Sequence, residues 1–211
     1  MWVTRMQASK QTLWNRWRLT GVIGAVLIAM SVAAYLLAPD PVAGVRLVIR
    51  LTARTSLALF LLAFVASALV RLFPSEFTQW LRGNRRYFGV SFAISHFVHL
   101  SAIFTLARLD YGVFLQLTNI VAYVGGGLAY VFITLMVATS FDRTAALIGR
   151  QAWLWLHTAG MWYIWLSFAL NFGKRIPLHA GYVLPVMLIV LAAAVRLFST
   201  LKSSKPGHQN I

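Results

Sequence analysis

The sequence contains no cysteine, and only four of its 211 residues are acidic. The lack of cysteine excludes a disulfide framework, a thiolate metal site and a Cys-ligated iron–sulfur cluster. Any redox centre must therefore use other ligands, and histidine is the obvious one. None of the four acids, Asp40, Glu76, Asp110 and Asp142, lies in the middle of an apolar run. This placement argues against a carboxylate proton relay and against a cation transporter.

Charged residues of either sign are also scarce. They make up 11% of the chain, against 60% for hydrophobic residues, whereas a soluble domain has roughly 25% charged residues. The 19 lysines and arginines give a net charge of +15. Because these basic residues lie between apolar runs, we expect them to orient helices and to contact membrane lipid rather than nucleic acid.

Six apolar stretches predict an all-α polytopic membrane protein with six transmembrane helices. The stretches are 19–38, 55–70, 87–107, 117–139, 150–172 and 176–195. The predicted organisation is a basic head at 1–18, a six-helix domain at 19–200 and a polar tail at 201–211. If both termini are cytoplasmic, 13 of the 19 basic residues fall on the cytoplasmic side, as the positive-inside rule favours.

The sequence offers no place for a catalytic domain. No segment outside the apolar stretches is long enough for one, and no glycine-rich phosphate loop occurs between a strand and a helix. The chain therefore has no flavin-binding domain of its own, and no hydrolytic constellation of residues is present. These features predict a subunit that serves an enzyme rather than a catalytic subunit.

Three histidines lie well inside the apolar stretches, His157 in 150–172 and His96 and His99 in 87–107, whereas His179 lies at the start of 176–195 and is expected to be an ordinary interfacial residue. An imidazole buried in hydrocarbon is costly unless it binds a ligand or forms hydrogen bonds, so such a residue is a functional candidate. A haem fits between transmembrane helices and needs one or two axial ligands. From the residues alone, haem ligation and simple hydrogen bonding to a neighbouring helix both remain open.

Three arginines, Arg46, Arg50 and Arg54, precede the second apolar stretch at intervals of four residues. This spacing places them on one face of a helix that begins early. Such a stripe could bind haem propionates or an anionic headgroup, or its members could extend to the membrane surface as ordinary interfacial residues.

Three short segments between residues 45 and 172 resemble the ferric reductase-like transmembrane proteins. They are Thr52-Ala-Arg-Thr-Ser-Leu57, then Arg85-Arg86 with Gly89 and His99-Leu100, and finally Thr139-Ser140 with Gly149 and Trp153-x-x-Leu156-His157. Their order and spacing are most similar to the haem-binding membrane subunits of bacterial periplasmic methionine sulfoxide reductase systems.

This resemblance implies a haem-binding four-helix core made of the second to fifth helices, with one or two b-type haems. It implies that the iron has His99 and His157 as axial ligands, and Arg54 matches an arginine of the family. The implied function is electron transfer across the bacterial inner membrane. The donor would be quinol or a flavin reductase, and the acceptor a periplasmic oxidoreductase subunit.

The chain departs from the family pattern at Leu170, where the family has a second histidine on the fifth helix. Helix arithmetic also places His99 and His157 roughly 9 Å apart in depth, and His96 and His157 roughly 4 to 5 Å apart, at 1.5 Å per residue. The pair His96 and His157 is therefore an alternative to His99 and His157. The alternative function is a haem-free membrane anchor or assembly partner of the same superfamily.

Overall fold

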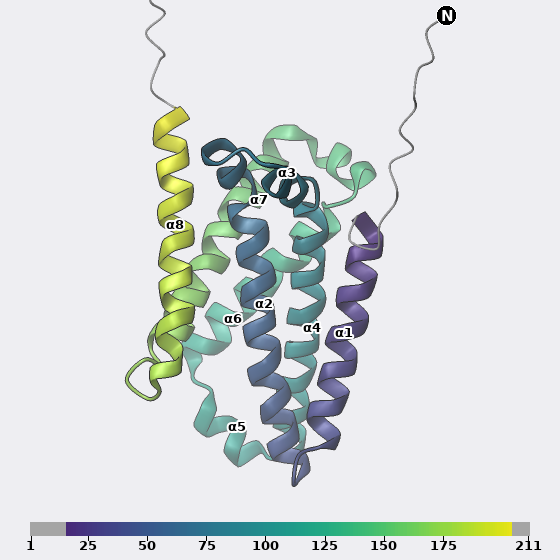
Figure 1. The fold of residues 1–211 in the computed structure, drawn as a ribbon. Coiled ribbons are helices and arrows are strands. Elements are labelled where there is room, and N and C mark those ends of the chain that lie inside the picture. The colour runs from purple at the N-terminus through teal and green to yellow at the C-terminus, as the bar shows by residue number, and fades with distance from the viewer. Residues whose placement is uncertain (1–15, 204–211) are drawn as a thin grey trace, which may run out of the picture.

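The computed structural model describes residues 16–203, which form a helical bundle with no strand in that range (Figure 1). The long helices are α1 (Arg16–Leu36), α2 (Pro41–Leu72), α4 (Arg85–Leu109), α6 (Ile120–Ala138), α7 (Asp142–Gly173) and α8 (Val183–Ser203). The short ones are α3 (Glu76–Gly83), α5 (Tyr111–Leu117) and the 3₁₀ turn η1 (Ala180–Tyr182). Most of the predicted head (1–18) and tail (201–211) lies outside the described residues.

The two ends of the bundle are named after the short helices that lie there, α3 and α5. At the α3 end, α2 finishes and α4 begins on either side of α3, and both α1 and α8 also have their outer termini there (Figure 1). At the α5 end, α4 finishes and α5 follows it directly. The described chain therefore starts and finishes at the same end of the bundle.

Five of the described helical segments are long and apolar enough to cross a membrane: α1, α2, α4, α6 and the segment Ala180–Lys202, which contains η1 and α8. Their outward faces carry many exposed leucine, valine, isoleucine and phenylalanine side chains. The chain is an all-α integral membrane protein. Helix α7 is not among these five, because its tryptophans, tyrosine, histidine and asparagine lower its hydropathy. The sixth span remains a prediction.

Short polar residues define several helix ends. Asp40 caps α2 by accepting a hydrogen bond of 2.8 Å from the backbone N–H of Ala43, and Pro41 occupies the first turn. Asp110 and Asn119 cap α5 and α6 in the same way. Helix α8 begins at Val183, later than residue 176 of the sixth apolar stretch. Its proline therefore lies in the first turn, where no kink results.

The contact between α2 and α4 is the most extensive in the bundle. Hydroxyl side chains lie between these helices, where Ser56 donates a hydrogen bond of 2.9 Å to Ser95 and the Thr55 hydroxyl lies 3.0 Å from the same oxygen. Small polar residues allow close packing and interhelical hydrogen bonds in a membrane. This contact fixes the position of the histidines that follow Ser95 on α4.

Candidate functional site

His157 lies on α7, two turns beyond a break in that helix at Gly149. Gly149 has φ +75°, a left-handed conformation that glycine adopts without steric cost. After the break, the Trp153 ring stacks on the His157 imidazole, with ring centroids 4.2 Å apart. The Trp153 indole N–H donates a hydrogen bond of 2.9 Å to the carbonyl of Thr139 at the end of α6. The tryptophan therefore fixes both the ring of His157 and the α6–α7 junction.

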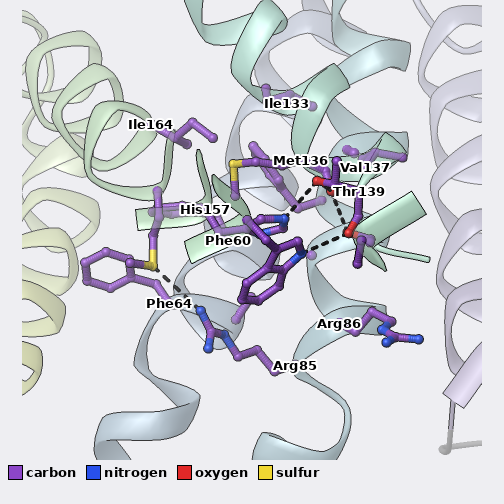
Figure 2. A pocket seen from close by; sticks show the side chains of 18 residues that line it. Phe60, Phe64, Arg85, Arg86, Ile133, Met136, Val137, Thr139, His157 and Ile164 are labelled. Atoms are coloured by element: carbon purple, nitrogen blue, oxygen red, sulfur yellow. Dashed lines mark hydrogen bonds between the residues drawn. The ribbon is translucent and has the colours of Figure 1, made fainter. Parts of the chain in front are cut away.

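The hydroxyl of Thr139 holds one nitrogen of His157. Its oxygen lies 2.7 Å from the Leu135 carbonyl and 3.1 Å from Nε2 of His157 (Figure 2). Because the hydroxyl has one hydrogen and donates it to the carbonyl, it accepts a hydrogen bond from Nε2–H. In this tautomer Nδ1 carries the lone pair. A metal can bind through Nε2 only if the hydrogen bond to Thr139 breaks.

A cavity of about 300 Å³ lies beside His157, at the lower end of the roughly 300–1,000 Å³ range of ligand pockets. Its walls are mainly apolar side chains of α2, α4, α6 and α7, with polar groups from His157, Arg85, Arg86 and Thr139. A Cβ atom added to Gly89 would meet no atom within 4 Å. Because Gly89 lines the cavity, the cavity has free space beside this residue of α4.

The two arginines at the cavity have different partners. Arg86 forms an ion pair with Asp142 at the start of α7. Arg85 donates a hydrogen bond of 3.3 Å to the Ser67 hydroxyl, and its charge acts on His157. Figure 2 shows Arg85 on the His157 side of α4 and Arg86 directed away from it. Arg85 is therefore the cation available to an anionic group in the cavity.

His99, on α4, has the hydrogen-bond pattern of a metal-ligating histidine. Its Nδ1 lies 3.1 Å from the Ile49 carbonyl and 3.0 Å from the Thr52 hydroxyl oxygen. The Thr52 hydroxyl donates its own hydrogen to the Val48 carbonyl at 2.6 Å. Nδ1 must therefore carry the hydrogen, which leaves a lone pair on Nε2. No described residue forms a hydrogen bond to that nitrogen, and a backbone carbonyl on Nδ1 is the usual support of a ligating Nε2.

His96 packs against His99, but aromatic rings fill the space around the pair. The two imidazoles are stacked with centroids 5.4 Å apart, and Phe92, Tyr130 and Phe168 have rings within 6 Å of His96. Nδ1 of His96 is buried and has no hydrogen-bond partner among the described residues. This region therefore combines a ligand nitrogen on His99 with closely packed rings around His96.

The histidines of α4 and α7 lie at different levels of the bundle. Tyr130 of α6 donates a hydrogen bond to the His96 carbonyl, whereas Thr139 contacts His157. Thr139 lies nine residues after Tyr130, which is about 14 Å along the helix, and Phe168 lies eleven residues after His157, which is about 17 Å. Two axial nitrogens on one iron lie only about 4 Å apart, because each metal–nitrogen bond is about 2 Å long.

The structure therefore does not bring His157 together with His99 or with His96. The sequence arithmetic gave smaller depth differences because it placed Arg86 and Arg150 at the same level. In the structure, the contacts of α6 with His157 and with His96 place His157 much closer to the α3 end than His96. A single haem between the two helices would require them to slide past each other, so each level must be considered as a separate site.

Leu170, at the position where the ferric reductase-like proteins that the sequence resembles have a second histidine, faces away from the bundle. Its side chain is 63% exposed, whereas the neighbouring Phe168 and Phe172 are buried. The amide of Asn171 donates a hydrogen bond to the Ser167 carbonyl and is exposed. Neither residue can ligate an iron beside His99 in this arrangement.

Arg54 lies in a basic group towards the α5 end. The hydroxyl of Tyr182 accepts a hydrogen bond of 3.2 Å from Arg175, and Arg54 acts on the same hydroxyl. The charge of Arg175 also acts on His99. Arg50 is exposed one turn before Arg54. The structure therefore brings Arg54 and Arg175 to the same tyrosine hydroxyl.

Several residues of these sites were not singled out from the sequence as site residues. Arg85, Arg175 and Tyr182 act on the histidines or on the predicted arginine only through the packing of different helices. Thr52 and Thr139 could have been identified from the sequence, because both belong to the segments that resemble the ferric reductase-like family. Their roles as hydrogen-bond partners of His99 and His157 required the structure.

No protein-family model, no curated protein and no solved structure matches this chain. Across residues 16–203, no group of three or more His, Cys, Asp or Glu side chains gathers in a way that could hold a metal ion. Haem is a different case, because its iron takes only one or two ligands from the protein.

Proposed function

We propose that this protein is a membrane-embedded b-type haem subunit that passes electrons across the bacterial inner membrane. The observation that carries the proposal is the cavity beside His157, which combines a histidine, an arginine and apolar walls inside a helical bundle. These are the groups that a haem needs for its iron, its propionates and its macrocycle. When bound, the haem supplies one-electron redox chemistry, which no side chain of this cysteine-free chain offers.

The residues fit the group with one local change. His157 must release Thr139 to present Nε2, and the Trp153 ring that stacks on the imidazole limits how far it can turn. Arg85 would pair with a propionate, while the aromatic and methionine side chains exclude water. Apolar walls give the site a low dielectric constant, and this strengthens the electrostatic effect of each nearby charge on the iron.

We also propose a second haem site at His99. Its support is the lone pair on Nε2, set by the Ile49 carbonyl, and the charge of Arg175 nearby. Phe92, Phe168 and Tyr130 occupy the space beside the imidazoles, so a macrocycle there requires these rings to separate. Two haems at the two levels would together span the bundle.

We infer the side of the electron donor from the basic residues. The positive-inside rule favours a cytoplasmic α3 end, with α7 as the sixth span. The donor, quinol or a flavin reductase, would then act at the end nearer the His157 cavity. A periplasmic oxidoreductase subunit would accept electrons at the α5 end.

The test is optical. The protein is purified in detergent after expression with added haem precursor, and reduced-minus-oxidised spectra are recorded for the natural chain, for His157→Ala and for His99→Ala. We expect a b-type α band, and we expect His157→Ala to remove most or all of it. The matched control is His179→Ala, because His179 is exposed in the loop before η1, and this change should leave the spectrum intact.

The spectra of these variants distinguish one bound haem from two and from none. Loss of the band in His157→Ala alone supports one haem in the cavity, and roughly half the band lost in each variant supports two haems. A colourless but folded natural protein would refute haem binding altogether.

A haem-free membrane anchor or assembly partner is the second candidate. It is favoured by the outward position of Leu170, which leaves each level with histidines from one helix only. In that case His157 and His99 serve as interhelical hydrogen-bonding residues through Thr139 and Thr52. The measurement that supports it is retention of a co-purified membrane or periplasmic partner by a colourless preparation.

A further inference from the structure

The outer end of the cavity lies beside a short stretch of α7 that precedes the break in this helix. The cavity extends from buried residues, among them Phe64 on α2, to Arg86, which is exposed at the start of α4. Ala145 of α7 lines the same cavity. It belongs to residues 142–148, the stretch before the break, which lies in green at the α3 end in Figure 1. This segment therefore covers part of the outer end of the cavity.

Segment 142–148 is held to the bundle by little apolar contact. None of its seven residues is buried, five of them are exposed, and the Leu147 side chain is 84% exposed. A region with few buried apolar contacts opens at a low cost in free energy. The part of α7 after the break differs, because Met161, Ile164 and Phe168 are buried there. Segment 142–148 is therefore the part of α7 that can move most easily.

The backbone is not helical at either end of this segment. Gly149, which follows it, is exposed and has φ +75°, and a Cβ atom added there would meet no atom within 4 Å. Phe141, which precedes it, is extended and stacks on Trp17 of α1, with ring centroids 5.6 Å apart. Hinges are a few positions at the ends of elements that absorb changes in φ and ψ. Gly149 has the free space and the backbone conformation of such a hinge.

The polar contacts of the segment are exposed. Asp142 forms the ion pair with Arg86 of α4, and the two side chains are 86% and 40% exposed. The Thr144 hydroxyl donates a hydrogen bond to the Ala138 carbonyl at the end of α6, also at an exposed position. Exposed ion pairs contribute little to stability. The contact between the segment and α4 can therefore separate and form again readily.

We propose that segment 142–148 is a lid over the cavity, which turns about Gly149 and is held closed by the ion pair of Arg86 and Asp142. When the pair separates, the lid turns away from α4 and the cavity opens at the α3 end to a ligand larger than water. When the pair forms, the lid limits the access of water to the apolar walls. The inference concerns access to the cavity and does not depend on haem binding.

Thiol labelling tests the lid, because the chain has no cysteine of its own. Ala93→Cys places a thiol in the cavity wall on α4, at a residue that is 2% exposed. Its rate of reaction with N-ethylmaleimide is measured in detergent, on protein prepared without added haem precursor. We expect Asp142→Asn to raise this rate about two- to fivefold, the effect of losing an exposed ion pair. Gly149→Ala should raise it at least about fivefold, because alanine is strained in the closed conformation.

Two matched controls accompany these variants. Arg143→Gln removes a neighbouring exposed charge of the lid that is not in the ion pair, and it should leave the rate unchanged. Ala192→Cys places the thiol at a buried residue of α8 that does not line the cavity, and its rate should not respond to Asp142→Asn. Salt at about 1 M, which screens charges beyond roughly 3 Å, should raise the rate of Ala93→Cys only while Asp142 is present.

Three results would overturn the proposal. An unchanged rate in Asp142→Asn would remove the ion pair from the mechanism, and an unchanged rate in Gly149→Ala would remove the hinge. A parallel rise at Ala192→Cys would mean that the whole bundle loosens rather than a lid. If Ala93→Cys does not fold, as judged by circular dichroism, Ala63→Cys on α2 supplies the thiol at another lining residue, and the same comparisons decide.

Discussion

The region around His157 and the region around His96 and His99 contrast in what each provides for a ligand. The first has a cavity of about 300 Å³, but Thr139 holds Nε2 of its histidine. The second has a histidine, His99, whose Nε2 forms no hydrogen bond among the described residues, and aromatic rings pack around the neighbouring His96. The contrast shows that a buried histidine defines a ligand site only together with space on its open side. Substitutions can change the free space or the hydrogen bonding of a histidine nitrogen at one level of the bundle and leave the other level intact.

The largest expected effect is at Phe168, which packs beside His96 and is 6% exposed. Phe168→Ala should lower the free energy of unfolding by about 3–5 kcal/mol, because it removes a buried aromatic ring and leaves a cavity. If the rings beside His96 are what exclude a haem from His99, added haem should partly restore the stability. Thermal melting in detergent, with and without haem, measures both effects. Equal melting temperatures for this variant and the natural chain would contradict the packing described here.

The second change fills the cavity at the other level. Gly89→Leu places a side chain in the cavity beside His157, where a Cβ meets no atom within 4 Å. We expect folding to be retained and haem occupancy to fall at least about tenfold, which corresponds to about 1.4 kcal/mol of binding free energy. Occupancy is measured as haem absorbance per protein.

Two further glycine variants serve as controls for this change. Gly89→Ala should behave as the natural chain, since the cavity has room for a methyl group. Gly160→Ala should instead lower stability by about 1–3 kcal/mol, because its Cβ would lie 2.6 Å from the sulfur of Met136. A Gly89→Leu protein that binds haem fully would show that the cavity is not the haem site.

The smallest effect is expected at Thr52, which contacts Nδ1 of His99. Thr52→Val keeps the shape of the side chain and removes the hydroxyl, so only one acceptor, the Ile49 carbonyl, remains for Nδ1–H. Interhelical hydrogen bonds in membranes contribute about 0.6 kcal/mol on average, and we expect a loss of that size in thermal melting. A loss of several kcal/mol would mean that Thr52 has a larger role than supporting His99.

The sequence was most informative about the helices and least informative about their relative depth. The apolar run at 87–107 closely predicts α4, and the run at 19–38 closely predicts α1, because hydrocarbon length and flanking charges limit where a span can lie. Helices α3 and α5 were not predicted, since neither is long enough to show a hydropathy signal. Gly149 appeared in the family resemblance, but its role as the break in α7 became visible only from its backbone conformation.

The sequence by itself determined the chemistry available to this protein: no thiolates, four acids, three histidines well inside apolar runs and a large excess of arginine. It also determined that the chain is built from membrane helices. The tertiary structure decided which side chains meet, because the vertical offset of α4 and α7 depends on contacts between helices that no local pattern encodes. That offset separates His157 from His99 and places the cavity of about 300 Å³ beside His157.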